Sequence, residues 1–108
     1  KGVIKGAVYD NYRSVYYVIV EVPVNPELYQ LSLLQLYTNR PDIKVFLLDS
    51  SFEYLGEVFF KNFEVDQREV FVGKNGLYVS SNQQYNKTFD ENYLVYDVIR
   101  FDVLEYAD

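Results

Sequence analysis

The fold is decided by the stretch Tyr12-Arg13-Ser14-Val15-Tyr16-Tyr17-Val18-Ile19-Val20-Glu21-Val22. After Ser14 nearly every residue is β-branched or aromatic, which is typical of a β-strand. Side chains alternate between the two faces of a strand, and here both sets are apolar: Val15, Tyr17 and Ile19 on one face, Tyr16, Val18 and Val20 on the other. We therefore expect both faces of this strand to be covered.

Further strand-like stretches surround this one, and turn residues join them in pairs. The expected strands span residues 3–9, 43–48, 54–60, 69–72 and 77–81. The turns between partners are Asp10-Asn11, Asp49-Ser50-Ser51 and Gly73-Lys74-Asn75-Gly76, the last of which contains the hairpin signal Asn-Gly. Gly56 indicates a bulge. The sequence thus predicts an all-β fold, an antiparallel meander of hairpins.

Three segments fit the hairpin pattern less well. Asn25-Pro26-Glu27 is a helix-start signal, and the leucine-rich residues 28–37 favour a helix over a strand. We therefore expect one short helix near residues 26–37. Residues 62–67 and 82–92 are predicted to be exposed loops. The last stretch, residues 93–106, has its polar residues on neither a helical nor a strand face, and its Tyr, Val, Ile and Phe content favours a bent strand.

Composition limits the chemistry that the chain can perform. It has twelve tyrosines and eight phenylalanines but no histidine, cysteine, methionine or tryptophan. Serine–histidine and cysteine–histidine catalytic pairs, disulfides, and histidine- or thiolate-bound metals are therefore excluded within it. We expect most of the twenty rings to pack in the sheets, with only Tyr85 and Phe89 as contact residues.

Charge and length set further limits. The net charge is −6 and the basic residues are scattered, so we expect no nucleic-acid partner. No apolar run reaches the roughly eighteen residues of a membrane helix. The 108 residues fit one all-β domain, 1–108, or a C-terminal fragment of a larger protein. We favour a fragment, because the chain opens directly on a strand-like stretch, and it would then pack against the rest of a larger chain.

Three stretches of the chain carry a resemblance to known proteins: Tyr9 to Tyr17, Val45 to Glu57, and Gly76 to Asn82 followed by Phe89 to Asn92. They resemble the C-terminal part of a family of bacterial six-bladed-propeller-like lipoproteins, a domain-of-unknown-function family of the cell envelope. The resemblance implies about two blades of a propeller, in the periplasm or at the cell surface, with no catalytic residues to carry over. Because two isolated blades would expose sheet edges, a small β-sandwich or barrel stays open as the alternative.

The polar loop of residues 82–92 holds the candidate contact residues: Tyr85, Asn86, Phe89, Asp90 and Glu91. Tyrosine offers a flat apolar face and a hydroxyl, which suit a protein or glycan partner. Calcium is the one metal that the composition permits, through Asp90-Glu91-Asn92, although the spacing lacks the alternation of an EF-hand. We expect no cofactor otherwise.

These observations predict a non-catalytic binding or interaction module of a cell-envelope protein, with its ligand unspecified. One alternative is a carboxylate-dependent glycan hydrolase, for which the clusters Glu64, Asp66 and Glu69, Asp90 and Glu91, and Asp97 and Asp102 supply acids. Such an enzyme needs two carboxylates about 5 to 10 Å apart across one cleft. The other alternative is a purely structural module that completes a larger fold.

Overall fold

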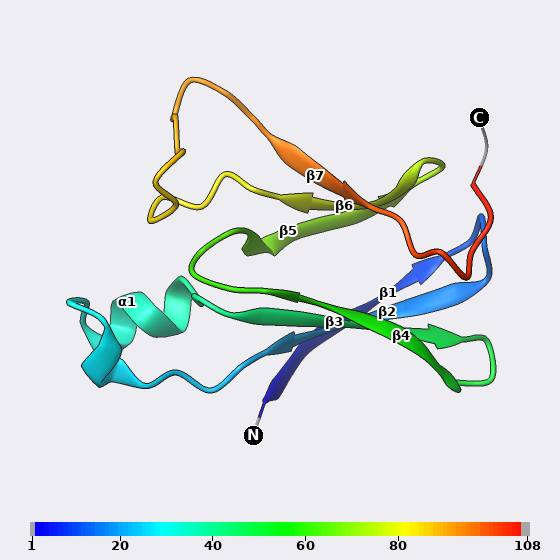
Figure 1. The fold of residues 1–108 in the computed structure, drawn as a ribbon, viewed down its shortest axis with the longest axis horizontal. Helices are drawn as coiled ribbons and strands as arrows, with labels where there is room; N and C mark the ends of the chain where they lie inside the picture. The colour runs from blue at the N-terminus through cyan, green and yellow to red at the C-terminus, as the bar shows by residue number, and fades with distance from the viewer. Residues whose placement is uncertain (1, 107–108) are drawn as a thin grey trace.

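A computed structural model of the protein describes residues 2–106 and contains seven antiparallel strands in two sheets. The first sheet has the order β1-β2-β3-β4 and the second β5-β6-β7 (Figure 1). The strands are β1 Val3–Asp10, β2 Val15–Glu21, β3 Ile43–Asp49, β4 Tyr54–Phe60, β5 Asp66–Gly73, β6 Gly76–Ser80 and β7 Tyr96–Ile99. Both sheets are meanders, so the predicted all-β class and hairpin series are confirmed. The described strands form no closed barrel.

The two sheets pack face to face, and strict alternation builds the core between them (Figure 1). Along β2 and β3 every second residue is buried. The buried core consists of Val15, Tyr17, Ile19, Ile43, Val45, Leu47, Phe60, Val65, Leu77 and Val79. The register of β3 and β4 shifts where Leu48 pairs with Tyr54, next to Gly56, so the predicted bulge is confirmed.

The outer face of the first sheet is apolar but no other layer within residues 2–106 covers it. The Tyr16 ring stacks on Phe52 and is tilted against Tyr9, with ring centroids 5.0 and 4.9 Å apart respectively. Phe52 and Phe59 remain about half exposed or more, at 65% and 49%. The prediction that both faces of β2 are covered is therefore wrong for the part of the chain that the structure describes, since only the inner face is.

The outer face of the second sheet has the same character. The rings of Phe71 and Tyr78 stack with centroids 4.9 Å apart and planes 7° from parallel, and Tyr96 meets Phe71 edge-on at 5.3 Å. Phe71 is nevertheless 46% exposed. Many of the rings thus lie on the two outer faces rather than in the core, which corrects the expectation that only Tyr85 and Phe89 are free for contact.

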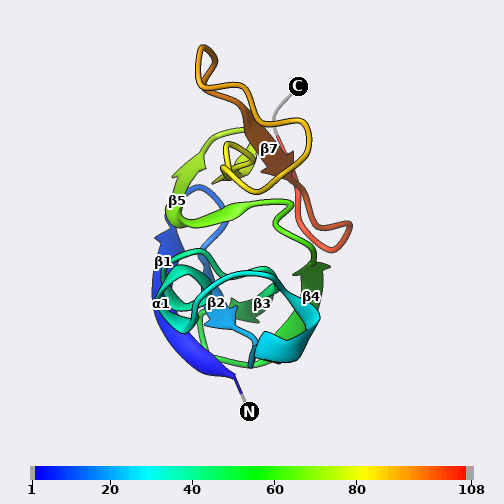
Figure 2. The same ribbon diagram turned by 90° about the vertical axis from the view of Figure 1, so that its left-hand side faces the viewer.

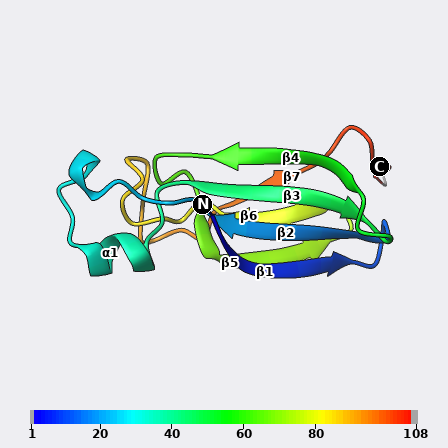
Figure 3. The ribbon, with the colours of Figure 1, turned by 90° about the horizontal axis from the view of Figure 1, so that it is seen from below.

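The sheets approach each other most closely along one side of the molecule. There β1 and β5 lie next to each other, whereas β4 and β7 lie on the far side (Figure 2). Seen from below, the four strands of the first sheet run side by side beneath the second (Figure 3). Each sheet keeps one unpaired edge on the β1–β5 side among the described strands.

The segment between β2 and β3 forms two short helices instead of the one helix expected near residues 26–37. A 3-10 helix spans Pro26–Leu28, capped by Asn25 as predicted, and α1 spans Leu33–Thr38. Ser32 starts α1 with a capping box: its hydroxyl accepts from the Gln35 backbone N–H at 3.1 Å, and its own N–H donates to Gln35 Oε1 at 2.7 Å. A serine that caps one helix does not continue another, which explains the break.

Two other expectations need correction. The segment 62–67 is not an exposed loop, because Phe63 and Val65 are buried and β5 begins at Asp66. In residues 93–106 only β7 is a strand, and a turn follows in which the Leu104 N–H donates to the Phe101 carbonyl at 3.0 Å. Apolar content alone did not separate a packed loop from a strand.

The turn between β1 and β2 connects the two sheets through Asp10, which is fully buried. Asp10 Oδ1 accepts from the backbone N–H groups of Tyr12 and Arg13 at 2.9 and 3.1 Å. Asp10 Oδ2 accepts from the Tyr17 hydroxyl at 2.7 Å and lies 3.2 Å from Arg13 Nε. Burial, and secondarily the bond to Asp10, raise the pKa of Tyr17 above its ordinary value, so the phenol stays a donor.

Arg13 carries this network across to the second sheet. Its guanidinium donates to the Gly73 and Lys74 carbonyls at 2.9 and 3.0 Å, in the hairpin that joins β5 to β6. The same group lies over the Tyr106 ring, 4.4 Å from its centroid. Asp10 and Arg13 therefore join the first turn, the β5–β6 hairpin and the end of the described chain.

Candidate functional site

The opposite end of the molecule holds a second, larger group of buried polar side chains. It lies where β2 ends, α1 ends, β5 begins and the chain leaves β6. We call the surface formed there by residues 26–40, 61–65 and 81–95 the α1 end (Figures 1 and 3). The buried polar residues beneath and within this surface are Glu21, Asn39, Asp66, Gln67, Ser80 and Gln83. Polar groups are buried at a cost unless partners satisfy them, so each has to be accounted for.

Gln67 lies at the centre of this group and is 4% exposed. Its Nε2 donates to Glu21 Oε2 at 3.1 Å and to the Thr38 carbonyl at 3.4 Å. The other Glu21 oxygen lies 3.6 Å from Arg40 Nε. By contrast, Gln67 Oε1 is buried and receives no hydrogen bond from residues 2–106. This acceptor is left open by the fold itself.

Asn39 joins three segments of the α1 end. Its Oδ1 accepts from Gln84 Nε2 at 3.2 Å and, more weakly, from Gln83 Nε2 and an Arg68 nitrogen at 3.4 Å each. Its Nδ2 donates to the Gln35 carbonyl in α1 at 3.1 Å. The loop after β6, the start of β5 and α1 are thus held in fixed relation by one amide.

Asp66 and Arg68 form a bidentate pair at the start of β5. Arg68 Nε donates to Asp66 Oδ1 and the terminal nitrogen to Oδ2, both at 2.9 Å. Burial alone would raise the pKa of Asp66, but the hydrogen bonds and charge of Arg68 outweigh it, so the pKa lies below its usual value. The carboxylate form is therefore favoured by the folded protein.

We expect Asp66→Asn to lower the free energy of unfolding by about 1 to 2 kcal/mol at pH 7, a modest effect because Arg68 is partly exposed. Since the folded pKa lies below the unfolded value of 3.8, the stabilisation is present above that pH and is lost as the pH falls through the folded pKa. Urea denaturation at pH 7 and near pH 2.5 should show the gap closing in acid. Asp102→Asn, at an exposed site, is the control. A gap that is unchanged in acid would refute the assignment.

The predicted contact residues all lie in the loop between β6 and β7, but they separate into two groups. Tyr85 packs against Phe63 with ring centroids 5.3 Å apart, and Asn86 Nδ2 donates to the Glu64 carbonyl at 3.3 Å. Phe89, Asp90 and Glu91 are exposed at the outer part of the loop. Tyr85 and Asn86 therefore support the loop, and only the other three are free to meet a partner.

Sequence reasoning missed the most exposed apolar side chains of the α1 end. In the loop these are Tyr93 and Leu94, which are 65% and 76% exposed. On the α1 side they are Leu28, Leu33, Leu34 and Tyr37. Leucine at exposed positions of a six-residue helix could have been recognised from the helical spacing, but residues 93–95 had been assigned to a strand.

No acidic residue lines either of two pockets found among residues 2–106, so no catalytic pair of carboxylates faces them. One pocket lies between β1 and β5 and the other on the outer face of the first sheet near Val20 and Phe46. Burial, and then the charge of Glu64, raise the pKa of Asp97, but Asp97 is exposed. Within residues 2–106 no three acidic side chains gather closely enough to hold a metal ion. Asp90 Oδ1 instead accepts from the Asn92 N–H at 2.9 Å, and calcium binding there stays a prediction.

The fold and the site together define an all-β domain of two facing antiparallel sheets, with a polar network and exposed apolar loops at one end. A scan against protein-family models found no match, and neither did a search of curated proteins. Among the solved structures, the chain is similar to a member of the DUF4221 family from Bacteroides vulgatus ATCC 8482, with 34% identity and a TM-score of 0.73.

The match covers 94% of this chain and 26% of the Bacteroides chain, so the protein described here spans about a quarter of the length of the structure it resembles. The predicted resemblance to a domain of unknown function is therefore confirmed at that level. The propeller and the lipoprotein that the resemblance implied stay predictions.

No helix among the described residues is long and apolar enough to cross a membrane.

Proposed function

We propose that the protein is a non-catalytic interaction module, built as two consecutive sheets of a propeller-like protein of the bacterial cell envelope. The exposed outer faces of the two sheets support the propeller-like architecture. In a propeller each sheet packs against another sheet on both of its faces. Here each sheet packs against the other on its inner face only, and aromatic side chains lie on its outer face. The closest approach of β1 and β5 agrees with sheets that radiate from an axis.

Binding takes place at the α1 end, to a protein or glycan partner. The observation that carries this proposal is the group of exposed apolar side chains on two separate segments, α1 and the loop between β6 and β7, that Asn39 connects. Each of the two segments exposes at least two large apolar side chains, and exposed apolar surface of this kind marks interaction sites on folded proteins. The buried network beneath it fixes the two segments, which lowers the ordering cost of binding.

Photocrosslinking in cells tests this role. A benzoylphenylalanine placed at Leu94 or Leu34 of the full-length protein should give discrete adducts after irradiation, because both side chains are about 75% exposed on the proposed surface. Lys74, exposed in the β5–β6 hairpin at the opposite end of the molecule, is the control position. Protease and glycosidase digestion of the adducts separates a protein from a glycan partner. Adducts no more abundant than those from position 74 would leave only a structural role and refute the binding surface.

A further inference from the structure

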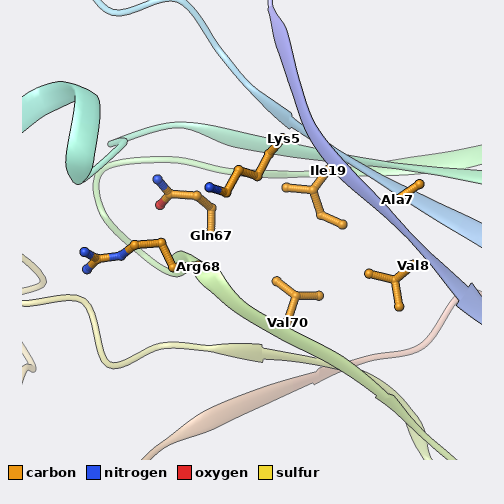
Figure 4. Close-up of a pocket in the computed structure, with 8 residues that line it drawn as sticks. Lys5, Ala7, Val8, Ile19, Gln67, Arg68 and Val70 are labelled. Carbon is orange, nitrogen blue, oxygen red and sulfur yellow. The ribbon is translucent and has the colours of Figure 1, made fainter.

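A small cavity opens where the edge strands β1 and β5 approach each other (Figure 4). Its volume is about 150 Å³, the size of a small organic molecule. Aliphatic side chains from both sheets form its wall: Val8, Ile19 and Val70. Three polar side chains, Lys5, Gln67 and Arg68, also line it, together with Gly6 and Ala7. It is separate from the exposed loops of the α1 end and does not depend on the function proposed for them.

The polar side chains of this cavity have unused bonding capacity. Gln67 Oε1 is buried and lacks a donor from the described part of the chain, although the rest of the side chain is fixed by Glu21 and Thr38. The Lys5 ammonium extends toward Gln67 in the close-up and forms no ion pair with residues 2–106 (Figure 4). An acceptor and a cation thus line the same small space.

The cavity is lined by two cations, Lys5 and Arg68, and by no acid. Glu21 lies beside Arg40, and Asp66 accepts the two hydrogen bonds of Arg68. Glu69, which follows Arg68 in β5, is exposed and does not line the cavity, so Lys5 is the lining cation that forms no ion pair with residues 2–106. A cation would be repelled here, and an anion without a hydrogen to donate would leave Gln67 Oε1 unsatisfied.

We propose that this cavity binds a small hydroxycarboxylate, of the class to which acidic sugars belong. The carboxylate pairs with Lys5 and with the edge of Arg68, a hydroxyl donates to Gln67 Oε1, and the carbon skeleton packs against Val8, Ile19 and Val70. The unpaired edges of β1 and β5 offer further backbone donors and acceptors to the other hydroxyls. Each polar requirement of the cavity is met by one group of such a ligand.

Isothermal titration of the full-length protein with glucuronate and galacturonate tests the proposal, with glucose and inorganic phosphate as comparison ligands. At least one hexuronate should bind at least about tenfold more tightly than glucose or phosphate, because only it supplies both a carboxylate and hydroxyl donors. Methyl glucuronide, in which the anomeric hydroxyl is blocked, distinguishes the two sources of a hexuronate. Retained binding indicates the end of a glycan, and lost binding indicates the free monosaccharide.

Lys5→Met should weaken hexuronate binding about tenfold or more, and Lys74→Met, which removes the same charge at an exposed position in the β5–β6 hairpin, should leave it unchanged. Gln67→Leu should also weaken binding, but it breaks the bond to Glu21, so the exposed Lys5 provides the decisive variant. The proposal is overturned if neither hexuronate binds, if glucose binds equally well, or if Lys5→Met binds as the unaltered protein does.

Discussion

Replacing Asp10 with alanine is expected to lower the free energy of unfolding by about 3 to 5 kcal/mol, the cost of breaking a buried ion pair from one side. The carboxylate accepts hydrogen bonds from two backbone N–H groups of its turn and from the Tyr17 hydroxyl, and it forms an ion pair with Arg13. Without it, the buried hydroxyl loses its acceptor and the nearly buried guanidinium loses its opposite charge. Urea denaturation at pH 7 measures the loss.

Asp102→Ala removes the same side chain from an exposed position and should change the free energy of unfolding by less than about 0.5 kcal/mol. Asp10→Asn should fall between the two, because an amide can still accept from the turn but carries no charge for Arg13. If Asp10→Ala proved as mild as Asp102→Ala, the connection between the two sheets would have to lie elsewhere, in the core alone.

The strands could be predicted from the sequence because their signals are local. Alternation along β2 and β3, the Asn-Gly turn and the bulge at Gly56 each involve only a few consecutive residues, and all three are present in the structure. The break before α1 was missed although it is also local. There the leucine content of residues 28–37 outweighed the capping signal of Ser32, which the structure shows to be decisive.

The parts that could not be predicted depend on contacts between distant residues. Asp10 reads as an ordinary turn residue, and nothing local indicates that Arg13 reaches Gly73, sixty positions later. Gln67 was placed in an exposed loop, yet it becomes the buried centre of the polar network because β2, α1 and β5 meet there. The sequence of a strand that is apolar on both faces also does not indicate whether a second sheet or loop within residues 2–106 covers its outer face.

The same limit applies to the candidate site. Tyr85 was selected because its loop is polar, but Phe63, from a segment also thought to be exposed, packs against it. Residues 93–95 were assigned to a strand by their apolar content, and β7 begins only at Tyr96. Apolar content therefore predicts the sheets correctly but does not predict which apolar residues are exposed, because exposed apolar loops and buried strands have the same composition.

The second large effect is expected at Gly76, in the hairpin that joins β5 to β6. Its φ is +144°, a conformation that residues with a side chain rarely adopt, and a Cβ atom there would lie 2.6 Å from the Ile99 carbonyl oxygen. That oxygen belongs to the backbone of β7 and cannot turn away. Gly76→Ala should therefore lower the free energy of unfolding by about 2 to 4 kcal/mol through strain and displacement of β7.

Gly6→Ala is the matched control, because a Cβ added at Gly6 meets no atom within 4 Å. It should change the free energy of unfolding by less than about 1 kcal/mol. Hydrogen exchange adds a local readout: in Gly76→Ala the amides of β6 and β7 should lose protection before those of β2 and β3. If both variants instead have the same free energy of unfolding, the second sheet does not require the close approach of β6 and β7. The pairing of these two strands would then tolerate a shift that the geometry at Gly76 excludes.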